Sequence, residues 1–336
     1  MNSFGIGFTG NLTVKETVEL TKLAEQRGFD YVWIADESPS YPFRDAFVNM
    51  TAIALNTKNI RIGSAVFVPY SRHPAILSVF ASTLAELSND RVAIGLGRGG
   101  SMVLRPLGMK MWDKPMATLR ESLIVMKKLL AGETVDFDGK AIKVKGVKLA
   151  APPKKKVPLY LAARGQKTLE MVGELADGAM LSCPPRSEAL KYSLKHIEAG
   201  AKAAGRKLSD IDVVNYLPFA VSDNRDEALE RVKTEVAFMA SDTPDEVHQL
   251  IGTNMVKMNE VRKALREGGL EKAMKAIPNE IVANFSIAGT LDDCMKAISE
   301  NFKYGANQLT VAIEGDKEAR ALGMSLMGDK IIPKFK

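Results

Sequence analysis

The chain is poor in the residues that metal centres and disulfide-stabilised domains require. Only two cysteines and three histidines occur among its 336 residues. Cys183 and Cys294 cannot build a disulfide framework, and neither has the neighbouring ligands of a zinc site. His73, His196 and His248 include no pair four residues apart, so we expect no histidine-based metal site.

Long apolar runs are also missing. No stretch approaches the roughly eighteen residues that a membrane-spanning helix needs. Residues 1–8 are apolar and glycine-rich but have no basic segment before them, unlike a signal peptide. Hydrophobic residues make up 46% of the chain and charged residues 26%, which is ordinary for a globular protein with a large core. We therefore expect a cytoplasmic protein that does not bind a membrane.

The excess of one charge is small. Lysine and arginine number 46 against 40 acidic residues, a net charge of +6. This is mild for a protein that binds nucleic acid, which we do not expect, but it favours an acidic small molecule. Part of the excess lies in residues 140–156, which hold seven lysines and no acid. That segment is either a solvated hairpin and linker or a docking surface for an anionic tail or partner.

Eight short apolar runs alternate with segments of helical periodicity. The runs are nearly continuous, as parallel strands buried on both faces are. The predicted strands are residues 4–8, 30–35, 60–66, 91–96, 157–161, 179–181, 211–221 and 307–313. The predicted helices are residues 13–27, 43–55, 74–87, 115–130, 167–176 and 188–204, and a helix that ends at Phe302 and starts at a capping box of Thr290 and Asp293.

This alternation fits a closed barrel or a doubly wound sheet. No linker rich in proline, serine and glycine divides the chain, which favours one α/β domain over residues 1–336, a (β/α)8 or TIM barrel. Two insertions are expected. A β-hairpin lies near 133–150 and turns at Asp138 and Gly139. A helical insertion lies near 240–280, because the helical stretch 225–276 is longer than one crossover needs.

A glycine-rich segment, GLGRGG at residues 95–100, follows the fourth strand. It superficially resembles a dinucleotide fingerprint, but that motif follows the first strand of a βαβ unit. Because glycine has no Cβ, the backbone here could approach a flat ring or a phosphate closely. The alternative is a tight loop with nothing bound.

Two adjacent acids, Asp36 and Glu37, follow the second strand. In a barrel this is the C-terminal face, where catalytic groups lie. Adjacent side chains in a strand point to opposite sides, so at most one of the two faces a ligand. Helix capping and surface solvation are the alternative. His73 follows the third strand and either lines the mouth of the barrel or caps the next helix.

Six segments in a fixed order carry a family resemblance. They are GFDYVWIAD (28–36), GSAVFVPYSRHPA (63–75), RVAIGLG (91–97), LAGE (130–133), VPLYLAARG (157–165) and ADG (176–178). Together they resemble the luciferase-like superfamily, and within it the deazaflavin-dependent branch of methylenetetrahydromethanopterin reductases. The resemblance implies an enzyme that transfers a hydride between coenzyme F420 and a small-molecule substrate, with the cofactor at the C-terminal mouth of a barrel. We also expect a homo-oligomer, a dimer or a tetramer.

The same resemblance implies roles for residues around the cofactor's ring. Asp36 corresponds to the acid that contacts the deazaflavin near its reacting ring. Ala65 and Val66 correspond to a pair that is joined by a non-prolyl cis peptide bond and forms a bulge behind the ring. Arg98 and Gly99 correspond to the loop around the ring and its side chain.

A second set of residues corresponds to the binding site of the cofactor's phosphate tail. These residues are Arg164, Gly165, Gln166 and Lys167 at a predicted helix start, with Ser182 as a further contact. A helix start suits this task because its free N–H groups attract anions.

Three positions depart from the family pattern. Methanopterin reductases carry acids where this chain has Gly7 and Gly100, and many relatives carry a histidine where it has Glu37. Glu37 could act as the proton donor instead, because burial can raise the pKa of a carboxyl far enough. Two other functions stay open: an FMN-dependent monooxygenase on the same fold, and a non-catalytic member that only binds the cofactor or a partner.

Overall fold

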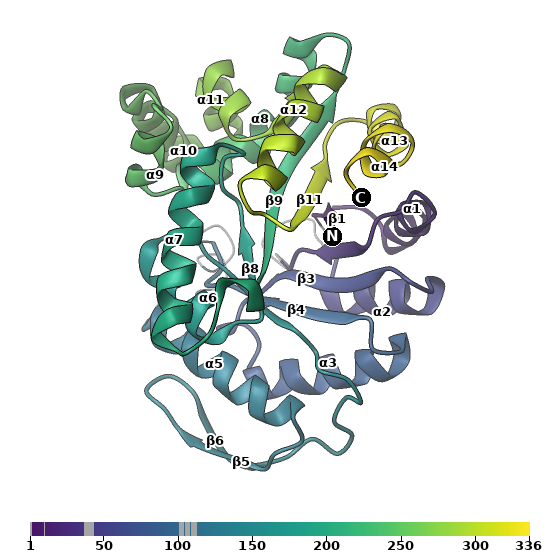
Figure 1. Cartoon of the computed structure of the whole chain (residues 1–336), viewed down its shortest axis with the longest axis vertical. Helices are drawn as coiled ribbons and strands as arrows, with labels where there is room; N and C mark the ends of the chain where they lie inside the picture. The colour runs from purple at the N-terminus through teal and green to yellow at the C-terminus, as the bar shows by residue number, and fades with distance from the viewer. Residues whose placement is uncertain (1, 10, 37–43, 101–103, 105–107, 109–112) are drawn as a thin grey trace.

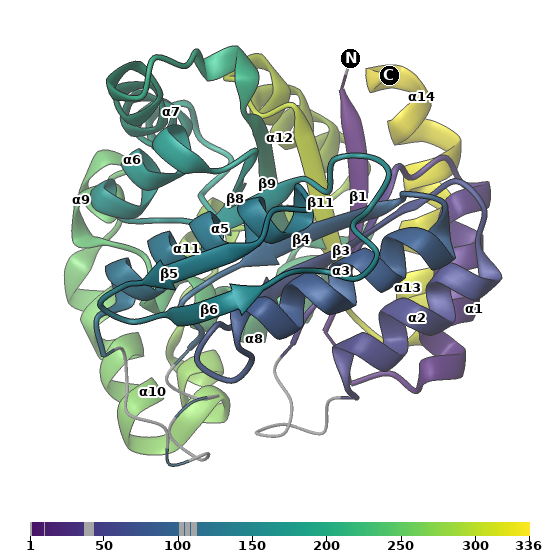
Figure 2. The same cartoon turned by 90° about the horizontal axis from the view of Figure 1, so that it is seen from below.

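The computed structural model describes residues 2–9, 11–36, 44–100, 104, 108 and 113–336. Eight parallel strands close into a barrel, and helices surround it (Figures 1 and 2). Around the barrel the order is β1, β2, β3, β4, β7, β8, β9 and β11, and β11 pairs with β1. The strands are Ser3–Phe8 (β1), Tyr31–Ile34 (β2), Arg61–Phe67 (β3), Val92–Leu96 (β4), Leu159–Ala162 (β7), Gly178–Leu181 (β8), Asp212–Val221 (β9) and Gln308–Ile313 (β11). The predicted (β/α)8 barrel is confirmed.

The helices outside the barrel begin at identifiable caps. Thr13 and Glu16 form a capping box at α1, and Thr290 and Asp293 form the predicted one at α12. The helices that follow the barrel strands are Val14–Gln26 (α1), Ala46–Asn56 (α2), Pro74–Ser88 (α3), Pro115–Leu130 (α5), Gln166–Leu175 (α6), Ser187–Ala203 (α7), Arg225–Ser241 (α8), Leu291–Lys303 (α12) and Lys317–Leu326 (α13). Helix α2 starts later than the predicted residue 43, because Asp45 caps it by accepting from the Val48 N–H.

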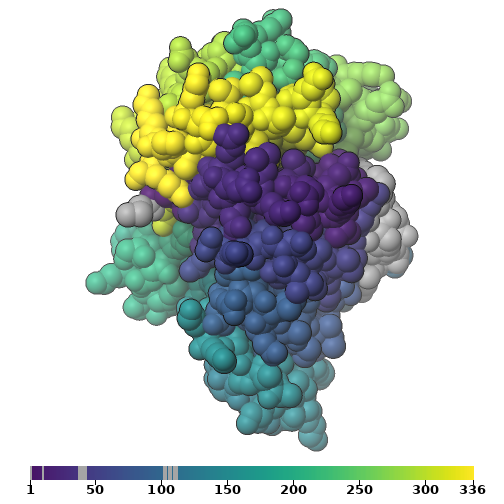
Figure 3. Space-filling view, turned by 90° about the vertical axis from the view of Figure 1, so that its right-hand side faces the viewer, coloured from purple at the N-terminus to yellow at the C-terminus, as the bar shows by residue number. Residues whose placement is uncertain are grey.

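The hairpin expected near 133–150 consists of β5 (Val135–Asp138) and β6 (Lys143–Val147), which pair antiparallel. It projects from the barrel at the lower end of Figures 1 and 3. Glu121 of α5 fixes its turn, since the carboxylate accepts from the N–H groups of Lys140, Ala141 and Ile142 at 2.8–2.9 Å.

A group of helices separates β9 from the last barrel strand. After α8 come α9 (Asp245–Leu250), α10 (Met255–Ala276) and α11 (Asn279–Asn284), and α10 is kinked at Gly268 and Gly269. A strand that the sequence did not predict, β10 (Ile287–Gly289), pairs with the end of β9. Short helical turns, η1 (Leu208–Asp210), η2 (Met327–Ile331) and α14 (Ile332–Phe335), complete the described structure. Figure 3 shows the two ends of the chain side by side.

Inside the barrel, aromatic side chains pack against glycines. Trp33 is fully buried and donates its indole N–H to Gln308 at 2.7 Å. A Cβ at Gly63 would lie 2.2 Å from the Trp33 ring, so only glycine leaves room for that ring. This packed layer separates the spaces at the two ends of the barrel. In the described parts of the chain, no helix combines the length and apolar character that crossing a bilayer requires.

Candidate functional site

A cavity of about 430 Å³ opens at the C-terminal ends of the barrel strands. Its walls come from the ends of β2, β3, β4, β7, β8, β9 and β11 and from α5 and α8. Apolar side chains make up most of the wall, with a few charged groups among them. Size, position and lining are those of a small-molecule site in a TIM barrel.

The floor of the cavity is formed by β3 and β4. The peptide bond between Ala65 and Val66 is cis, as the family resemblance implies, and the pairing of β3 with β4 shifts register between Ser64 and Phe67. A Cβ at Gly97 would lie 2.4 Å from the Val66 side chain. The glycine at position 97 therefore makes room for the β3 bulge, which itself forms the surface that a ligand would meet.

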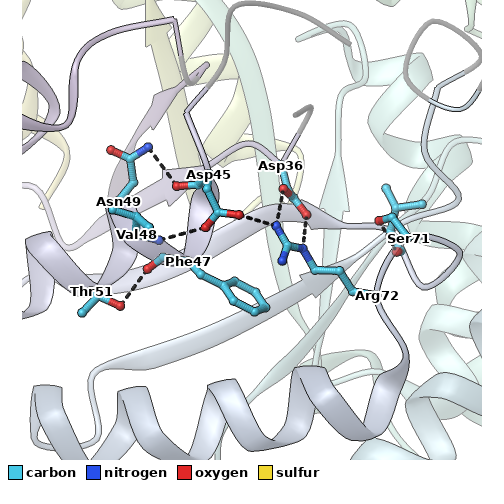
Figure 4. Close-up of polar contacts among 9 residues, drawn as sticks. Asp36, Asp45, Phe47, Val48, Asn49, Thr51, Ser71 and Arg72 are labelled. Carbon is cyan, nitrogen blue, oxygen red and sulfur yellow. Dashed lines mark hydrogen bonds and ion pairs between the residues drawn. The ribbon is translucent and has the colours of Figure 1, made fainter. Parts of the chain in front are cut away.

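Asp36 lies at the end of β2 on the cavity wall and is 6% exposed. Arg72 donates to it from Nε at 3.1 Å and from Nη2 at 3.3 Å, and also contacts Asp45 at 2.7 Å (Figure 4). The guanidinium lies over the Phe47 ring, 4.1 Å from its centre. Burial raises the pKa of Asp36, although Arg72 acts in the opposite direction. Asp36 is thus a cavity carboxyl held in one orientation and caps no helix.

Two arginines meet over one carboxylate at the side of the cavity. Arg98 follows β4 and Arg164 follows β7, and both contact Asp242 in the link between α8 and α9, at 2.9 and 2.8 Å. Gly99, beside Arg98, has φ +72°, a conformation that favours glycine. Two guanidinium groups, those of Arg98 and Arg164, and the backbone at Gly99 therefore line this side of the cavity.

The start of α6 also reaches the cavity. Gly165 is the N-cap of this helix, no side chain caps it, and Arg164, Gly165 and Ser182 all line the cavity wall. Gln166 and Lys167 do not line it; both are exposed, and Gln166 donates to Glu170 at 2.8 Å. The structure therefore brings three of the five predicted tail residues together and leaves the other two at the rim.

The remaining predicted positions have different outcomes. Glu37 lies outside the described residues. His73 caps α3 by accepting from the Ala75 N–H at 3.2 Å, so the capping interpretation is the right one. Gly100 lines the cavity, whereas Gly7 faces Tyr216, whose hydroxyl oxygen would lie 2.0 Å from a Cβ at position 7.

Sequence reasoning missed four residues of this site. Arg72 lies in the matched segment 63–75, but that segment did not indicate that Arg72 would pair with Asp36. No pattern in the sequence marks the other three: Glu235 on α8, Asp242 in the link that follows α8, and Tyr216 on β9. Burial raises the pKa of Glu235, which lines the cavity from α8.

Comparisons with known proteins agree with one another. A model of the luciferase-like monooxygenase family matches residues 4–308. The 5,10-methylenetetrahydromethanopterin reductases of Methanolobus tindarius and Archaeoglobus fulgidus are each 33% identical to the chain, covering 97% and 99% of it and 100% and 99% of their own lengths. The structure of the coenzyme F420 dependent tetrahydromethanopterin reductase from Methanopyrus kandleri superposes with a TM-score of 0.89 at 30% identity, covering 100% of this chain and 99% of that one.

Proposed function

The chain belongs to the luciferase-like monooxygenase family, and we propose that it is a coenzyme F420-dependent oxidoreductase. In this proposal a hydride passes between the deazaflavin and a small molecule of the methylenetetrahydromethanopterin class. The observation that carries it is the full-length identity of 33% to reductases of that name, together with a cavity at the mouth of the barrel.

The described residues suit such a cofactor. The floor at Ala65 and Val66 is apolar, and a flat ring would lie on it beside Asp36. Arg164 and the uncapped helix start at Gly165 suit a phosphate, because cations and free N–H groups attract it. When bound, F420 supplies a hydride donor or acceptor at C5 of its ring, while the protein supplies orientation and electrostatics.

The remaining assignments follow from position. We assign Arg98 and Gly99 to the loop around the ring, Ser182 to the tail, and Gln166 and Lys167 to the outer part of the tail beyond the cavity. Asp36 would contact the ring through a carboxyl whose orientation Arg72 and Asp45 fix. Glu37 stays a prediction as proton donor, tested by a pH profile of Glu37→Gln.

The decisive test of the cofactor is a comparison of affinities. We expect the purified protein to bind F420 at least tenfold more tightly than FMN, a difference of about 1.4 kcal/mol. Fluorescence titration of both cofactors under the same conditions measures this ratio. Equal affinities, or tighter FMN binding with oxygen consumption, would assign the protein to the monooxygenases instead.

Turnover separates an enzyme from a protein that only binds the cofactor. With reduced F420, we expect methylenetetrahydromethanopterin to be reduced and the absorbance of oxidised F420 to appear in equal amount. Tight F420 binding with no turnover for this substrate or for a panel of other small acceptors would indicate a non-catalytic member of the family.

We also infer that the protein forms a homo-oligomer through α2 and α3, which pack side by side. Large apolar side chains are exposed on these two helices: Val48, Leu55, Ile76, Val79 and Leu87. Clusters of this kind mark association surfaces. We expect sedimentation analysis to show a dimer or tetramer, and Ile76→Glu to dissociate it, whereas Leu250→Glu on α9 leaves it intact. A monomeric wild-type protein would refute this inference.

A cytoplasmic location is a further proposal. Cys183 and Cys294 are both buried and free, as thiols of proteins in a reducing compartment are. Fractionation of cells that produce the protein tests it.

A further inference from the structure

Among the residues that the structure describes, three carboxylates line the cavity, and one of them differs from the other two. Asp36 is bound by Arg72, and Asp242 is bound by Arg98 and Arg164. Glu235 forms no hydrogen bond or ion pair with any residue that the structure describes. Its neighbours on the same face of α8, three and four residues on, are Phe238 and Met239, which also line the cavity.

A second carboxyl lies close behind Glu235. Glu314 directly follows β11 and lines a small hollow of about 20 Å³ next to the main cavity, and Thr9 borders both spaces. Burial and the charge of Glu235 raise the pKa of Glu314 to about 8, although Arg320 of α13 acts in the opposite direction. Arg231 of α8 approaches Gly315, but Glu227 and the Val221 carbonyl hold its guanidinium.

Two carboxyls in this setting do not both ionise near neutral pH. Burial disfavours each negative charge, and each charge disfavours the other. The pair therefore titrates as a unit that keeps one proton while the surrounding solvent is neutral. Since Glu235 reaches the cavity and Glu314 lies behind it, a proton leaves the pair toward the ligand through Glu235.

We propose that Glu235, in place of Glu37, is the acid that protonates the substrate of this enzyme and that Glu314 is the positioning residue that keeps a proton on the pair. This inference rests on the proposed function. Its basis is geometric: among the described residues of an apolar cavity wall, Glu235 is the carboxyl without a partner, and a second carboxyl lies behind it.

The chemistry of the substrate class needs such an acid. In a 5,10-methylene compound one carbon bridges two nitrogens, and reduction turns this bridge into a methyl group on one of them. The bond from the carbon to the other nitrogen breaks, a hydride adds to the carbon, and that nitrogen takes a proton from Glu235. When bound, reduced F420 would supply the hydride with both electrons, and the separate proton released on its oxidation would return to the pair through solvent.

The first experiment compares three glutamine variants of the full chain. Glu235→Gln should lower kcat about 100-fold, with the affinity for F420 unchanged. Glu314→Gln should have a smaller effect on kcat. It should also shift the loss of activity at alkaline pH to lower pH, because removing a neighbouring negative charge lowers the pKa of Glu235. Glu230→Gln is the control, on the exposed side of α8 in an ion pair with Lys233, and should behave as wild type.

A second measurement does not depend on turnover. Infrared spectra of the full chain, with and without F420, should show the carbonyl stretch of a protonated carboxyl at pH 7. This band should be lost as the pH rises past about 8, and in Glu314→Gln it should be lost at lower pH. Wild-type activity in Glu235→Gln, or a band at pH 7 that persists unchanged in both variants, overturns the proposal. Failure of the wild type to bind F420 or to turn over refutes the proposed function instead.

Discussion

The barrel is hollow at both ends, and the larger hollow is the one to which we assign no chemistry. At the N-terminal ends of the strands a space of about 690 Å³ opens, against about 430 Å³ at the C-terminal ends. Volume alone would therefore point to the N-terminal end.

The two ends differ in what their acids contact. At the N-terminal end, Glu25 accepts from the N–H groups before β3, and Asp30 and Asp177 accept from the Phe4 and Leu159 N–H groups. These carboxylates hold the starts of strands together, as groups at the stability face of a barrel do. At the C-terminal end three described acids face a cavity, and two of them contact arginines: Asp36 contacts Arg72, and Asp242 contacts Arg98 and Arg164, which also line the cavity. What each charged group contacts, rather than the size of the space, distinguishes a site from a structural end.

The largest effect on the reaction is expected at the C-terminal end, from Asp36→Ala. Turnover should fall about 100-fold or more, because an oriented group at the reacting ring is lost. The melting temperature should change little, since Arg72 keeps its contact with Asp45. Steady-state kinetics and thermal unfolding of the same preparation measure both. A sharp loss of stability with full activity in the folded fraction would make Asp36 a structural residue and weaken the contrast.

An intermediate effect is expected from the cations near the tail. Arg164→Ala should weaken F420 binding about tenfold, or about 1.4 kcal/mol. Lys167→Ala should weaken it less, because Lys167 lies exposed at the rim. Both losses should be larger at low salt, where charge pairs are screened less. F420 titrations at two ionic strengths test this, and an effect independent of salt would indicate that the tail does not meet these cations.

The smallest effect on turnover is expected at the N-terminal end, from Glu25→Ala. This variant leaves the N–H groups of Lys58, Asn59 and Ile60 without their acceptor and should cost roughly 1–3 kcal/mol of stability. The rate per folded molecule should stay that of wild type. A reduced rate in fully folded protein would show that the N-terminal end takes part in the reaction.

The same residue gives the stability of that end a pH dependence. Burial acts to raise the pKa of Glu25, but its backbone hydrogen bonds outweigh burial and hold the pKa below the ordinary value of a glutamate. A carboxyl whose pKa is lower in the folded than in the unfolded protein stabilises the fold at pH values above its unfolded-state pKa. This contribution is lost as the pH falls through its folded-state pKa. Urea unfolding from pH 6 down to pH 3 should show this loss in wild type and a flatter profile in Glu25→Ala.

Much of the fold followed from local sequence, and less of the site did. Continuous apolar runs located all eight barrel strands, and Asp36 followed from its place at a strand end. Arg72 as the partner of Asp36, and Asp242 as the partner of Arg164, depend on which loops meet above the barrel. Sequence spacing does not encode that meeting, because 36 and 78 residues separate the partners. The three-residue strand β10 was missed because so short a run has no usable periodicity.

The ion pairs of Asp242 also bear on how an anion would bind in this cavity. Arg98 and Arg164 both form ion pairs with the Asp242 carboxylate, so a phosphate would have to compete with that carboxylate for them. Binding there would be an exchange of ionic partners, in which the ligand competes with the Asp242 contacts of 2.9 and 2.8 Å. Inorganic phosphate would bind through charge interactions and hydrogen bonds alone, whereas a ligand that also covers the cavity floor would gain apolar contacts. We therefore expect the Asp242 carboxylate to discriminate against small anions, which would not compensate for its ion pairs with apolar contact.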